Sequence, residues 1–220
     1  KLSDGYGTGI ILRGAGSNHV YNNLIVEPGK NSTSTRKNRS FHGIQVADRN
    51  TSTIANTFIL NNTIVSPAGN GIRMLNAYGD TNLVAINLVV DPGAWELKWQ
   101  RYHNRAFLTV KKNASITAQR NFYHLEIDSI KFTNPTADDY TLLANSPAID
   151  GGLNVDSLGI HEDIAEGHRF YGTSVDRGAY ETLMANHCNC DIVLDPEVTF
   201  ASGYSYDYAP GDTICITAGS

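Results

Sequence analysis

One structural unit recurs four times in the sequence, and this repeat restricts the fold more than any other feature. The copies begin at Gly9, Gly43, Gly71 and Ala106, and each reads as an apolar strand, a polar turn, an asparagine, a second strand and a turn. An internal period of roughly 20 to 50 residues is typical of solenoids and propellers, whose repeats bury a core only by stacking on one another. The chain is therefore expected to be a stack of similar units.

The recurring asparagines give the length of the unit. They are separated by 39, 25 and 34 residues and are Asn23, Asn62, Asn87 and Asn121. The shortest spacing is the bare unit, and the two longer ones contain polar insertions at 30–40 and 94–105, which the loops of a solenoid tolerate. One coil of a parallel β-helix needs about 25 residues with two or three short strands, because coils stack about 4.8 Å apart.

An asparagine at the same bend of every coil has a physical role. Its side-chain amide carries donors and an acceptor, so it can bond the asparagines of the coils above and below while tolerating a left-handed backbone. The sequence therefore predicts a structural ladder made of Asn23, Asn62, Asn87 and Asn121.

Composition and strand patterning indicate an all-β chain. Twenty glycines and eleven tyrosines against two methionines are typical of many short strands and turns. Ile44 and Val46 alternate with Gln45, which predicts an apolar inner face and a polar outer face. The predicted fold is a right-handed, single-stranded parallel β-helix. A β-sandwich or propeller is the alternative, although Asn70-Gly71 is the one hairpin-like turn signal between strands.

The charge balance argues against several classes of partner. With 17 Lys and Arg against 22 Asp and Glu, and with no basic block, the chain offers no nucleic-acid surface. No apolar run approaches the roughly 18 residues that a membrane span needs. The first residues, from Lys1 to Asp4, carry neither a Met nor a signal-peptide pattern. We therefore expect the chain to be a piece of a longer protein.

A series of short motifs occupies residues 138–181. The series consists of Asp139-Tyr140-Thr141-Leu142, Ser146-Pro147-Ala148-Ile149-Asp150-Gly151-Gly152, Asp163 with Arg169, and Asp176-Arg177-Gly178-Ala179-Tyr180-Glu181. It resembles the closing segment of bacterial secreted β-helix proteins of the pectate-lyase-like kind, which commonly reads D-Y-x-L, S-P-A-I-D-x-G, D-x-x-G-x-x-R and D-x-G-A-Y-E. Glu166 stands where the third pattern has its glycine. The resemblance implies a secreted or cell-surface bacterial protein.

The same resemblance implies a loop-rich C-terminal cap at residues 126–182, with the coils of the β-helix at 1–125. Such a cap would cover the last coil, whose open end otherwise exposes strand edges and an apolar core. Four charged residues of the cap are interpreted as structural, because buried pairs commonly tie loops together. These residues are Asp150, Asp163, Arg169 and Asp176.

Residues 183–220 are predicted to be a linker and the start of a second β-rich module. The stretch from Pro210 to Gly219, P-G-D-T-I-C-I-T-A-G, resembles the opening of another secreted β-helix. Cys188 and Cys190 are too close for a favoured mutual bridge, and either can pair with Cys215 in an oxidising compartment. A zinc site at the cysteine pair would lack its second pair of ligands, so no metal site is predicted.

Two arginines mark the outer face on which a ligand is expected. Ile11-Leu12-Arg13-Gly14 and Gly71-Ile72-Arg73-Met74 resemble strands of the alginate and chondroitin lyases that have this fold. The resemblance implies that Arg13 and Arg73 bind substrate. On the repeat alignment their backbones lie roughly 10 Å or more apart, a separation that suits gripping a long polyanion.

Three further residues are candidates for ligand binding. His42, directly before Gly43, can act as a base with an orienting partner at Asp48-Arg49, or it can be a local hydrogen-bonding group at a turn. Trp95 and Trp99 both lie in the insertion at 94–105. Exposed aromatic rings can stack on sugar rings, but the two tryptophans can equally form a small core of their own loop.

Two functions remain open from the sequence. The first is a structural or carbohydrate-binding solenoid whose partner is a polysaccharide. The alternative is a polysaccharide lyase, or a glycoside hydrolase, with part of its active site upstream of residue 1. A lyase must neutralise a uronate carboxylate and move a proton, so it needs Arg, Lys or Ca²⁺ beside a base. No cofactor is predicted, except Ca²⁺ if the protein is a lyase.

Overall fold

The computed structural model describes residues 1–3, 5–13, 17–35, 40–47, 56–76, 79–97, 100–110 and 115–183, with the backbone alone at residue 76, at 94–97 and at 100–105. The described residues belong to one compact unit, Lys1–Leu183. The predicted linker and second module at 183–220, with Cys188, Cys190 and Cys215, lie outside them except for residue 183.

Short parallel strands form three sheets, which we name A, B and C. Sheet A contains β1 (Leu2–Ser3), β4 (Leu24–Val26), β7 (Thr63–Val65), β10 (Leu88–Val90) and β15 (Phe122–His124). Sheet B contains β2 (Ile10–Leu12), β5 (Ile44–Ala47), β8 (Ile72–Asn76) and β13 (Leu108–Val110). Sheet C contains β3 (Asn18–Tyr21), β6 (Thr57–Leu60), β9 (Asn82–Ala85) and β14 (Ile116–Gln119).

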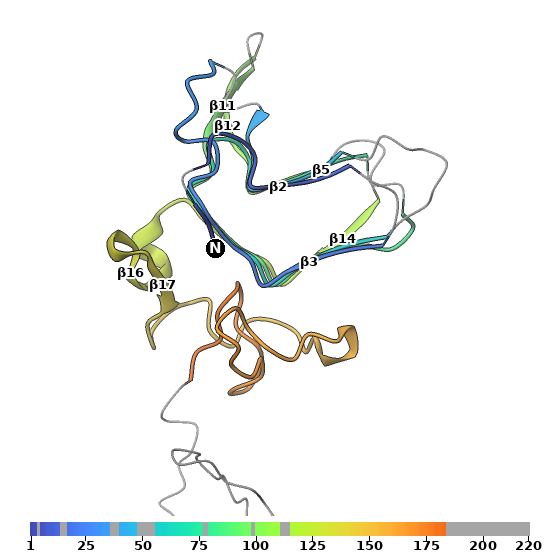
Figure 1. The fold of residues 1–220 in the computed structure, drawn as a ribbon, viewed down its shortest axis with the longest axis vertical. Helices are drawn as coiled ribbons and strands as arrows, with labels where there is room; N and C mark the ends of the chain where they lie inside the picture. The colour runs from blue at the N-terminus through green and yellow to red at the C-terminus, as the bar shows by residue number, and fades with distance from the viewer. Residues whose placement is uncertain are drawn as a thin grey trace, which may run out of the picture. The chain divides into compact units, whose positions relative to one another are not determined.

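The chain visits the sheets in the order B, C, A and then repeats the circuit, so the fold is a solenoid-like stack of four coils (Figure 1). Equivalent residues of successive coils pair in register, for example Ile25 with Ile64 and Ile64 with Val89. The repeat in the sequence is therefore a repeat in space. The coarse prediction of an all-β stack of parallel strands is confirmed.

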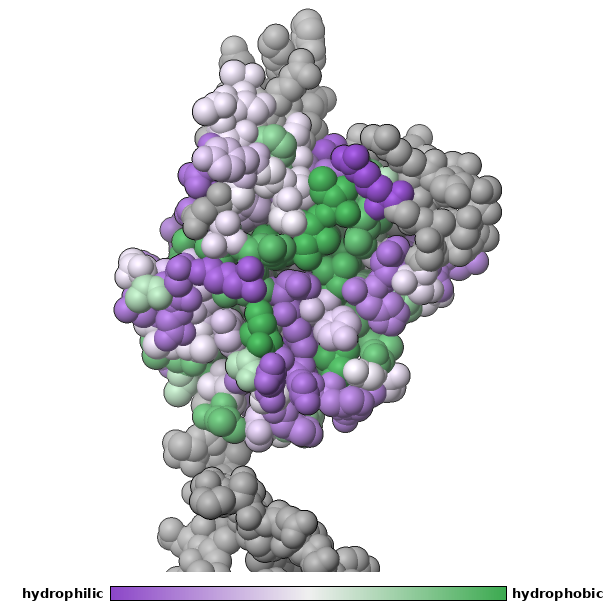
Figure 2. Space-filling model, viewed as in Figure 1, coloured by the Kyte–Doolittle hydropathy of each residue, from purple (hydrophilic) through white to green (hydrophobic). Residues whose placement is uncertain are grey.

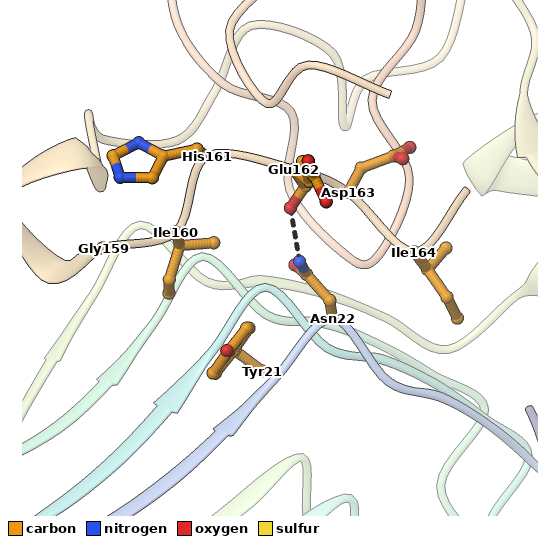
Figure 3. Close-up of a pocket in the computed structure, with 8 residues that line it drawn as sticks. All are labelled: Tyr21, Asn22, Gly159, Ile160, His161, Glu162, Asp163 and Ile164. Atoms are coloured by element: carbon orange, nitrogen blue, oxygen red, sulfur yellow. Dashed lines mark hydrogen bonds between the residues drawn. The ribbon is translucent and has the colours of Figure 1, made fainter. Parts of the chain in front are cut away.

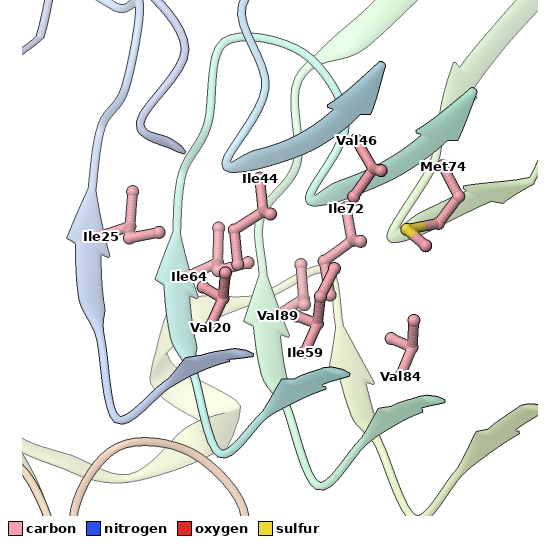
Figure 4. Packing of buried hydrophobic residues seen from close by; sticks show 10 residues of the cluster. All are labelled: Val20, Ile25, Ile44, Val46, Ile59, Ile64, Ile72, Met74, Val84 and Val89. Carbon is pink, nitrogen blue, oxygen red and sulfur yellow. The ribbon is translucent and has the colours of Figure 1, made fainter. Parts of the chain in front are cut away.

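Aliphatic side chains fill the inside of the coils (Figure 4). Each row of the core is contributed by one position of the repeat, such as Ile44 and Ile72 in sheet B or Ile59 and Val84 in sheet C. All four of these side chains are buried. The β-branched residues fit this environment because neighbouring strands about 4.8 Å apart bring equivalent side chains into contact.

The glycine of each Gly-Ile step is required by close packing across the coil. A Cβ on Gly43 would lie 2.5 Å from the Ile64 side chain and 2.6 Å from the carbonyl oxygen of Gly71. Gly9 and Gly71 occupy the same position in their coils and face Ile25 and Val89 in the same way. Only glycine leaves room for the bend to approach sheet A this closely.

The predicted asparagines form a continuous ladder through the bend between sheets C and A. The Nδ2 of each asparagine donates to the Oδ1 of the next at 2.9 Å, from Asn23 to Asn62, Asn87 and Asn121. The same Oδ1 atoms also accept the backbone N–H of the preceding asparagine. Asn62 and Asn87 are fully buried. The ladder therefore satisfies the buried backbone at the tightest bend of the coil.

The left-handed residue of this bend precedes the ladder asparagine instead of being that asparagine. The residues with positive φ are Asn22 (53°), Asn61 (50°), Ile86 (60°) and Arg120 (53°). A β-branched residue rarely adopts this conformation, which costs about 1 to 2 kcal/mol. Ile86 is nevertheless buried, so its packing offsets the backbone strain.

The segment predicted to cap the last coil packs along the side of the stack. It contains η1 (Ile127–Ile130), β16 (Phe132–Asn134), η2 (Pro135–Ala137), β17 (Asp139–Leu142) and η3 (Asp156–Leu158). Figure 1 shows this segment outside the outline of the coils, beside sheet A. Phe132, Tyr140 and Leu142 pack there against Val65 and Val90. The end-cap prediction is thus corrected to a flank cover, because the outer face of sheet A is itself apolar and needs burial.

The flank segment, residues 126–183, contacts the same bend in all four coils. Asn22 donates to the Glu162 carbonyl oxygen, and the Asn61 amide oxygen accepts from the Arg169 guanidinium. The N–H of Gly178 donates to the Ile86 carbonyl oxygen at 2.8 Å, and Arg177 Nε donates to the Arg120 carbonyl oxygen at 3.2 Å. Each coil is therefore tied to the flank segment by its own hydrogen bond.

The first coil leaves unpaired edges at β2 and β3, since neither strand has a partner on that side among the described residues. Large side chains are exposed at this end, including Leu2, Ile11 and Tyr21. Figure 2 shows hydrophobic surface across the middle of the end of the stack that faces the viewer. Such an end is a surface on which further strands can pair. Of the helices described, none is long and apolar enough to cross a membrane.

Candidate functional site

The outer face of sheet B carries a row of side chains that runs across the coils. The strand register places Gln45 beside Ile11, Arg73 beside Gln45, and Thr109 beside Arg73. The alternate positions point inward and are buried, such as Ile72. One coil after another therefore presents one outward residue, and Arg73 is the cation of this row.

Arg73 packs against a histidine from the preceding coil. Its Nη1 lies 3.0 Å from Nε2 of His42, while Nδ1 of His42 accepts the backbone N–H of Asn70 at 3.0 Å. Because Nδ1 accepts a hydrogen bond, the proton of the neutral ring is on Nε2. Arg73 Nη1 and His42 Nε2 are then both donors, so their contact is close packing rather than a hydrogen bond, and Arg73 is the group that can offer N–H donors to a ligand on this face. Burial lowers the pKa of Arg73, which still keeps its charge at neutral pH.

Of the two roles predicted for His42, the structure shows the local hydrogen-bonding group and not a substrate contact, because the residue is buried with 1% exposed. Its backbone N–H donates to the Thr8 hydroxyl oxygen at 3.2 Å, and that hydroxyl donates to the Ser40 carbonyl oxygen. His42 is therefore a hydrogen-bonding group of the coil that packs against Arg73, and it is not a direct ligand contact in this structure.

Thr8, His42 and Asn70 form a second ladder, which sequence reasoning missed. Each side chain bonds the next coil: the Thr8 hydroxyl accepts from His42, and His42 accepts from Asn70. Asn70 Nδ2 then donates to the Thr109 hydroxyl at 2.7 Å. The signal in the sequence was positional, because each of the three stands directly before a Gly-Ile step of the repeat.

The remaining predicted ligand contacts lie at the borders of this face. Arg13 follows β2 and is exposed. The insertion with the tryptophans forms an antiparallel hairpin of β11 (Ala94–Leu97) and β12 (Gln100–Arg105). The hairpin projects from the stack beside the starts of the sheet B strands (Figure 1). Trp95 lies on β11, but its side chain, all of Trp99, and the Asp48-Arg49 pair lie outside the description.

The four predicted structural residues of the flank segment hold its loops together. Asp150 accepts the N–H groups of Thr173 and Ser174, and Asp163 accepts those of Ala165 and Gly167. Glu166 adopts a left-handed φ of 65° between them, so the turn forms although glycine is missing there. These carboxylates are occupied by backbone donors, which argues against a catalytic role.

Arg169 lies at the centre of this network and is 1% exposed. Its guanidinium donates to the carbonyl oxygens of Gly178 and Ala179, and its Nε lies 3.9 Å from the carboxylate of Glu181. Asp163 and Asp176 are the other carboxylates near its charge. Sequence reasoning missed Glu181 as a member, although it ends the D-x-G-A-Y-E motif.

Three buried carboxylates surround one guanidinium, so one carboxyl should keep its proton near neutral pH. Burial, with a smaller contribution from the charge of Asp176, raises the pKa of Glu181 to about 8. Burial also raises the pKa of Asp176. A carboxyl whose folded pKa lies above its unfolded value contributes stability that is full below the unfolded pKa and lost as pH rises through the folded pKa.

The Glu181→Gln variant is therefore expected to depend less on pH than the wild type. The free energy of unfolding of the wild type should fall by roughly a few kcal/mol between about pH 5 and pH 9, and its melting temperature should fall with it. The variant should show only a small part of this decrease. Thermal unfolding followed by circular dichroism across this range measures it. Asp128→Asn, which removes an exposed carboxylate, is the control, and an equal slope in Glu181→Gln and wild type would contradict the assignment.

Among the described residues, no group of three His, Cys, Asp or Glu side chains is arranged to hold a metal ion. His187 with Cys188 and Cys190 lies outside the description. The outward row of sheet B that the strand register defines, Ile11, Gln45, Arg73 and Thr109, contains no carboxylate, the ligand that Ca²⁺ sites commonly use.

No protein-family model, curated protein or solved structure matches the chain. The class of protein is therefore defined by the fold and the site together. It is an all-β, solenoid-like stack of parallel strands that presents an arginine-bearing row on sheet B and is covered on sheet A by the flank segment.

Proposed function

We propose that this chain is part of a secreted or cell-surface bacterial protein of the right-handed parallel β-helix kind, and that it binds an extended acidic polysaccharide along the outer face of sheet B. The single observation that carries the proposal is the position of the partly exposed Arg73 in the outward row of sheet B, between Gln45 and Thr109. The C-terminal motifs that resemble the pectate-lyase-like proteins support the fold and the location.

The shape of the face suits a long ligand. Its outward residues recur once per coil in a straight row, so a polymer that runs along the stack can meet an equivalent position at each step. The β11–β12 hairpin stands at the border of the same face (Figure 1). A tryptophan ring from this hairpin would add a stacking surface for a sugar ring.

Charge favours an acidic ligand at this face. The chain as a whole has a formal net charge of −5, which repels polyanions in general. Arg73 and Arg13 nevertheless lie on or beside the outer face of sheet B. Arginine matches carboxylate geometry with two parallel N–H groups, so uronates are the preferred class.

The test is binding of polygalacturonate and alginate to variants of this face. Arg73→Gln is expected to weaken binding about tenfold or more, since a charge-assisted hydrogen bond contributes about 1.5 to 3 kcal/mol. Trp95→Ala and Trp99→Ala should also weaken it. Isothermal titration calorimetry at two salt concentrations measures the effect, and raised salt should reduce binding by the wild type.

Lys131→Gln is the matched control for this experiment, because it removes an exposed positive charge from the flank segment. It should leave the affinity unchanged. If no acidic polysaccharide binds, or if Lys131→Gln has the same effect as Arg73→Gln, the carbohydrate-binding proposal is wrong and a purely structural role remains.

A polysaccharide lyase is the second candidate. The outward Arg73 favours it, since a lyase needs a cation to neutralise the uronate carboxylate, whereas the buried His42, whose Nδ1 is occupied by the Asn70 N–H, does not supply the base. Ultraviolet absorbance of unsaturated products, with alginate, pectate and chondroitin sulfate and with or without Ca²⁺, tests it in the full-length protein. No product from any of the three would remove the lyase hypothesis.

A further inference from the structure

A hollow of about 520 Å³ lies between the first coil and the flank segment, away from sheet B (Figure 3). Its walls are the end of β3, at Tyr21 and Asn22, and the loop of residues 159–164. The volume lies within the range of roughly 300 to 1,000 Å³ that is typical of small-ligand sites. None of the residues proposed for the sheet B face contributes to its lining.

The floor and walls of the hollow combine an aromatic ring with aliphatic side chains. Tyr21 is 43% exposed, although it is a large hydrophobic residue on an outer face. Ile160 and Ile164 line the opposite wall, and Figure 3 shows both on the loop across from Tyr21. A sugar ring has apolar C–H faces, which pack on a tyrosine ring of this kind.

The polar groups that line the hollow are mainly hydrogen-bond acceptors, and none of them is a Lys or Arg side chain. The exposed Glu162 carboxylate has neither an ion pair nor a hydrogen bond within the part of the chain that the structure describes. The Asp163 carboxylate accepts from Ala165, Gly167 and Glu181 and is thereby occupied. The lining contains no Lys or Arg, so it disfavours uronates and sulfated sugars.

One polar atom at this place lacks a partner. Asn22 Nδ2 donates to the Glu162 carbonyl oxygen at 2.5 Å, which ties the loop to the coil. The Oδ1 atom of the same amide is buried without a hydrogen-bond partner in the described structure. An unsatisfied buried oxygen is costly, so a hydroxyl that reached it after a small loop shift would bind favourably.

We propose that this hollow is a second carbohydrate site, which takes an uncharged pyranose unit stacked on Tyr21 with its hydroxyls donating to the Glu162 carboxylate. His161, whose Nδ1 lies 3.4 Å from an Asp156 carboxylate oxygen, stands at the rim and supplies a further polar group. The site is independent of the sheet B face, and its ligand is an uncharged sugar rather than an acidic one.

The experiment uses cellotriose, mannotriose and xylotriose as neutral probes, with binding to the whole chain followed by saturation-transfer NMR and titration. At least one of the three should bind, and Tyr21→Ala should weaken that binding at least about fivefold, because an aromatic platform contributes roughly that factor or more. Glu162→Gln should also weaken it. Circular dichroism confirms that the variants are folded.

Tyr6→Ala is the matched control, since Tyr6 is a tyrosine that is 75% exposed and does not line the hollow. It should leave binding unchanged, and so should Arg73→Gln, which separates this site from the sheet B face. The proposal is overturned if none of the three probes binds, if Tyr6→Ala and Tyr21→Ala act alike, or if only trigalacturonate or a glucosamine trimer binds in a Tyr21-dependent way.

Discussion

Replacing Arg169 by methionine should lower the free energy of unfolding by about 3 to 5 kcal/mol, the usual result of removing one partner from a buried ionic network. The guanidinium is 1% exposed and bonds two backbone carbonyl oxygens of the flank segment. It also donates to Asn61, a bend residue of the second coil. Methionine fills much of the volume but leaves these acceptors without a donor and the nearby carboxylates without a counter-charge.

The effect should be this large because Arg169 bonds the flank segment to the second coil. Without it the carboxylates of Asp163, Asp176 and Glu181 repel one another in a buried place. The flank segment would then loosen from sheet A and uncover its apolar outer face. Urea unfolding followed by tryptophan fluorescence and circular dichroism measures the change, and hydrogen exchange should localise the loss to the flank segment.

Two variants make this result interpretable. Arg13→Met, which removes an exposed arginine, should change stability by no more than about 0.5 kcal/mol. The double variant Arg169→Met with Glu181→Gln should recover part of the loss, because it removes one of the stranded carboxylates. A loss below about 1 kcal/mol in Arg169→Met would show that the network contributes little.

Asn62→Ala is expected to cost about 3 kcal/mol, because it leaves several buried groups without partners at once. The Asn62 Nδ2 donates to Asn87 and to the carbonyl oxygens of Val20 and Leu60, and its Oδ1 accepts from the backbone and the side chain of Asn23. The residue is fully buried, so water cannot replace these bonds.

The position in the ladder provides a graded test of this expectation. Asn23→Ala, at the partly exposed end of the ladder, should cost less than Asn62→Ala. Asn145→Ala changes an exposed asparagine of the flank segment and should fall within about 0.5 kcal/mol of the wild type. Equal losses at Asn23 and Asn62 in equilibrium unfolding would contradict a cooperative, buried ladder.

The flank segment illustrates how far a strand pattern can be used for prediction. Sheet B strands alternate, as Gln45 and Arg73 between buried neighbours show, and this alternation assigned their faces correctly. Sheet A strands, such as Leu88–Val90, are apolar at every position. A continuous apolar strand is typical of burial on both faces. This signal pointed to a cover on sheet A, whereas the motif resemblance led to a cap at the end of the stack.

The candidate site was predictable only in part, for a similar reason. Arg73 could be placed outward from the alternation alone, because the side-chain period of a strand is two residues. The burial of His42 could not, since it depends on Thr8 and Asn70 from the neighbouring coils. The hollow at Tyr21 joins residues about 140 positions apart, and no local pattern links them.

The sequence by itself determined the repeat, the all-β class, the asparagine ladder and the inward and outward positions of sheet B, because each follows from local spacing repeated in every coil. Only the tertiary structure decided where the flank segment docks, which carboxylates share the Arg169 charge, and which polar side chains meet at the two candidate sites. Those contacts join segments far apart in the chain, and their geometry depends on the packing of the whole unit rather than on the pattern of any one coil.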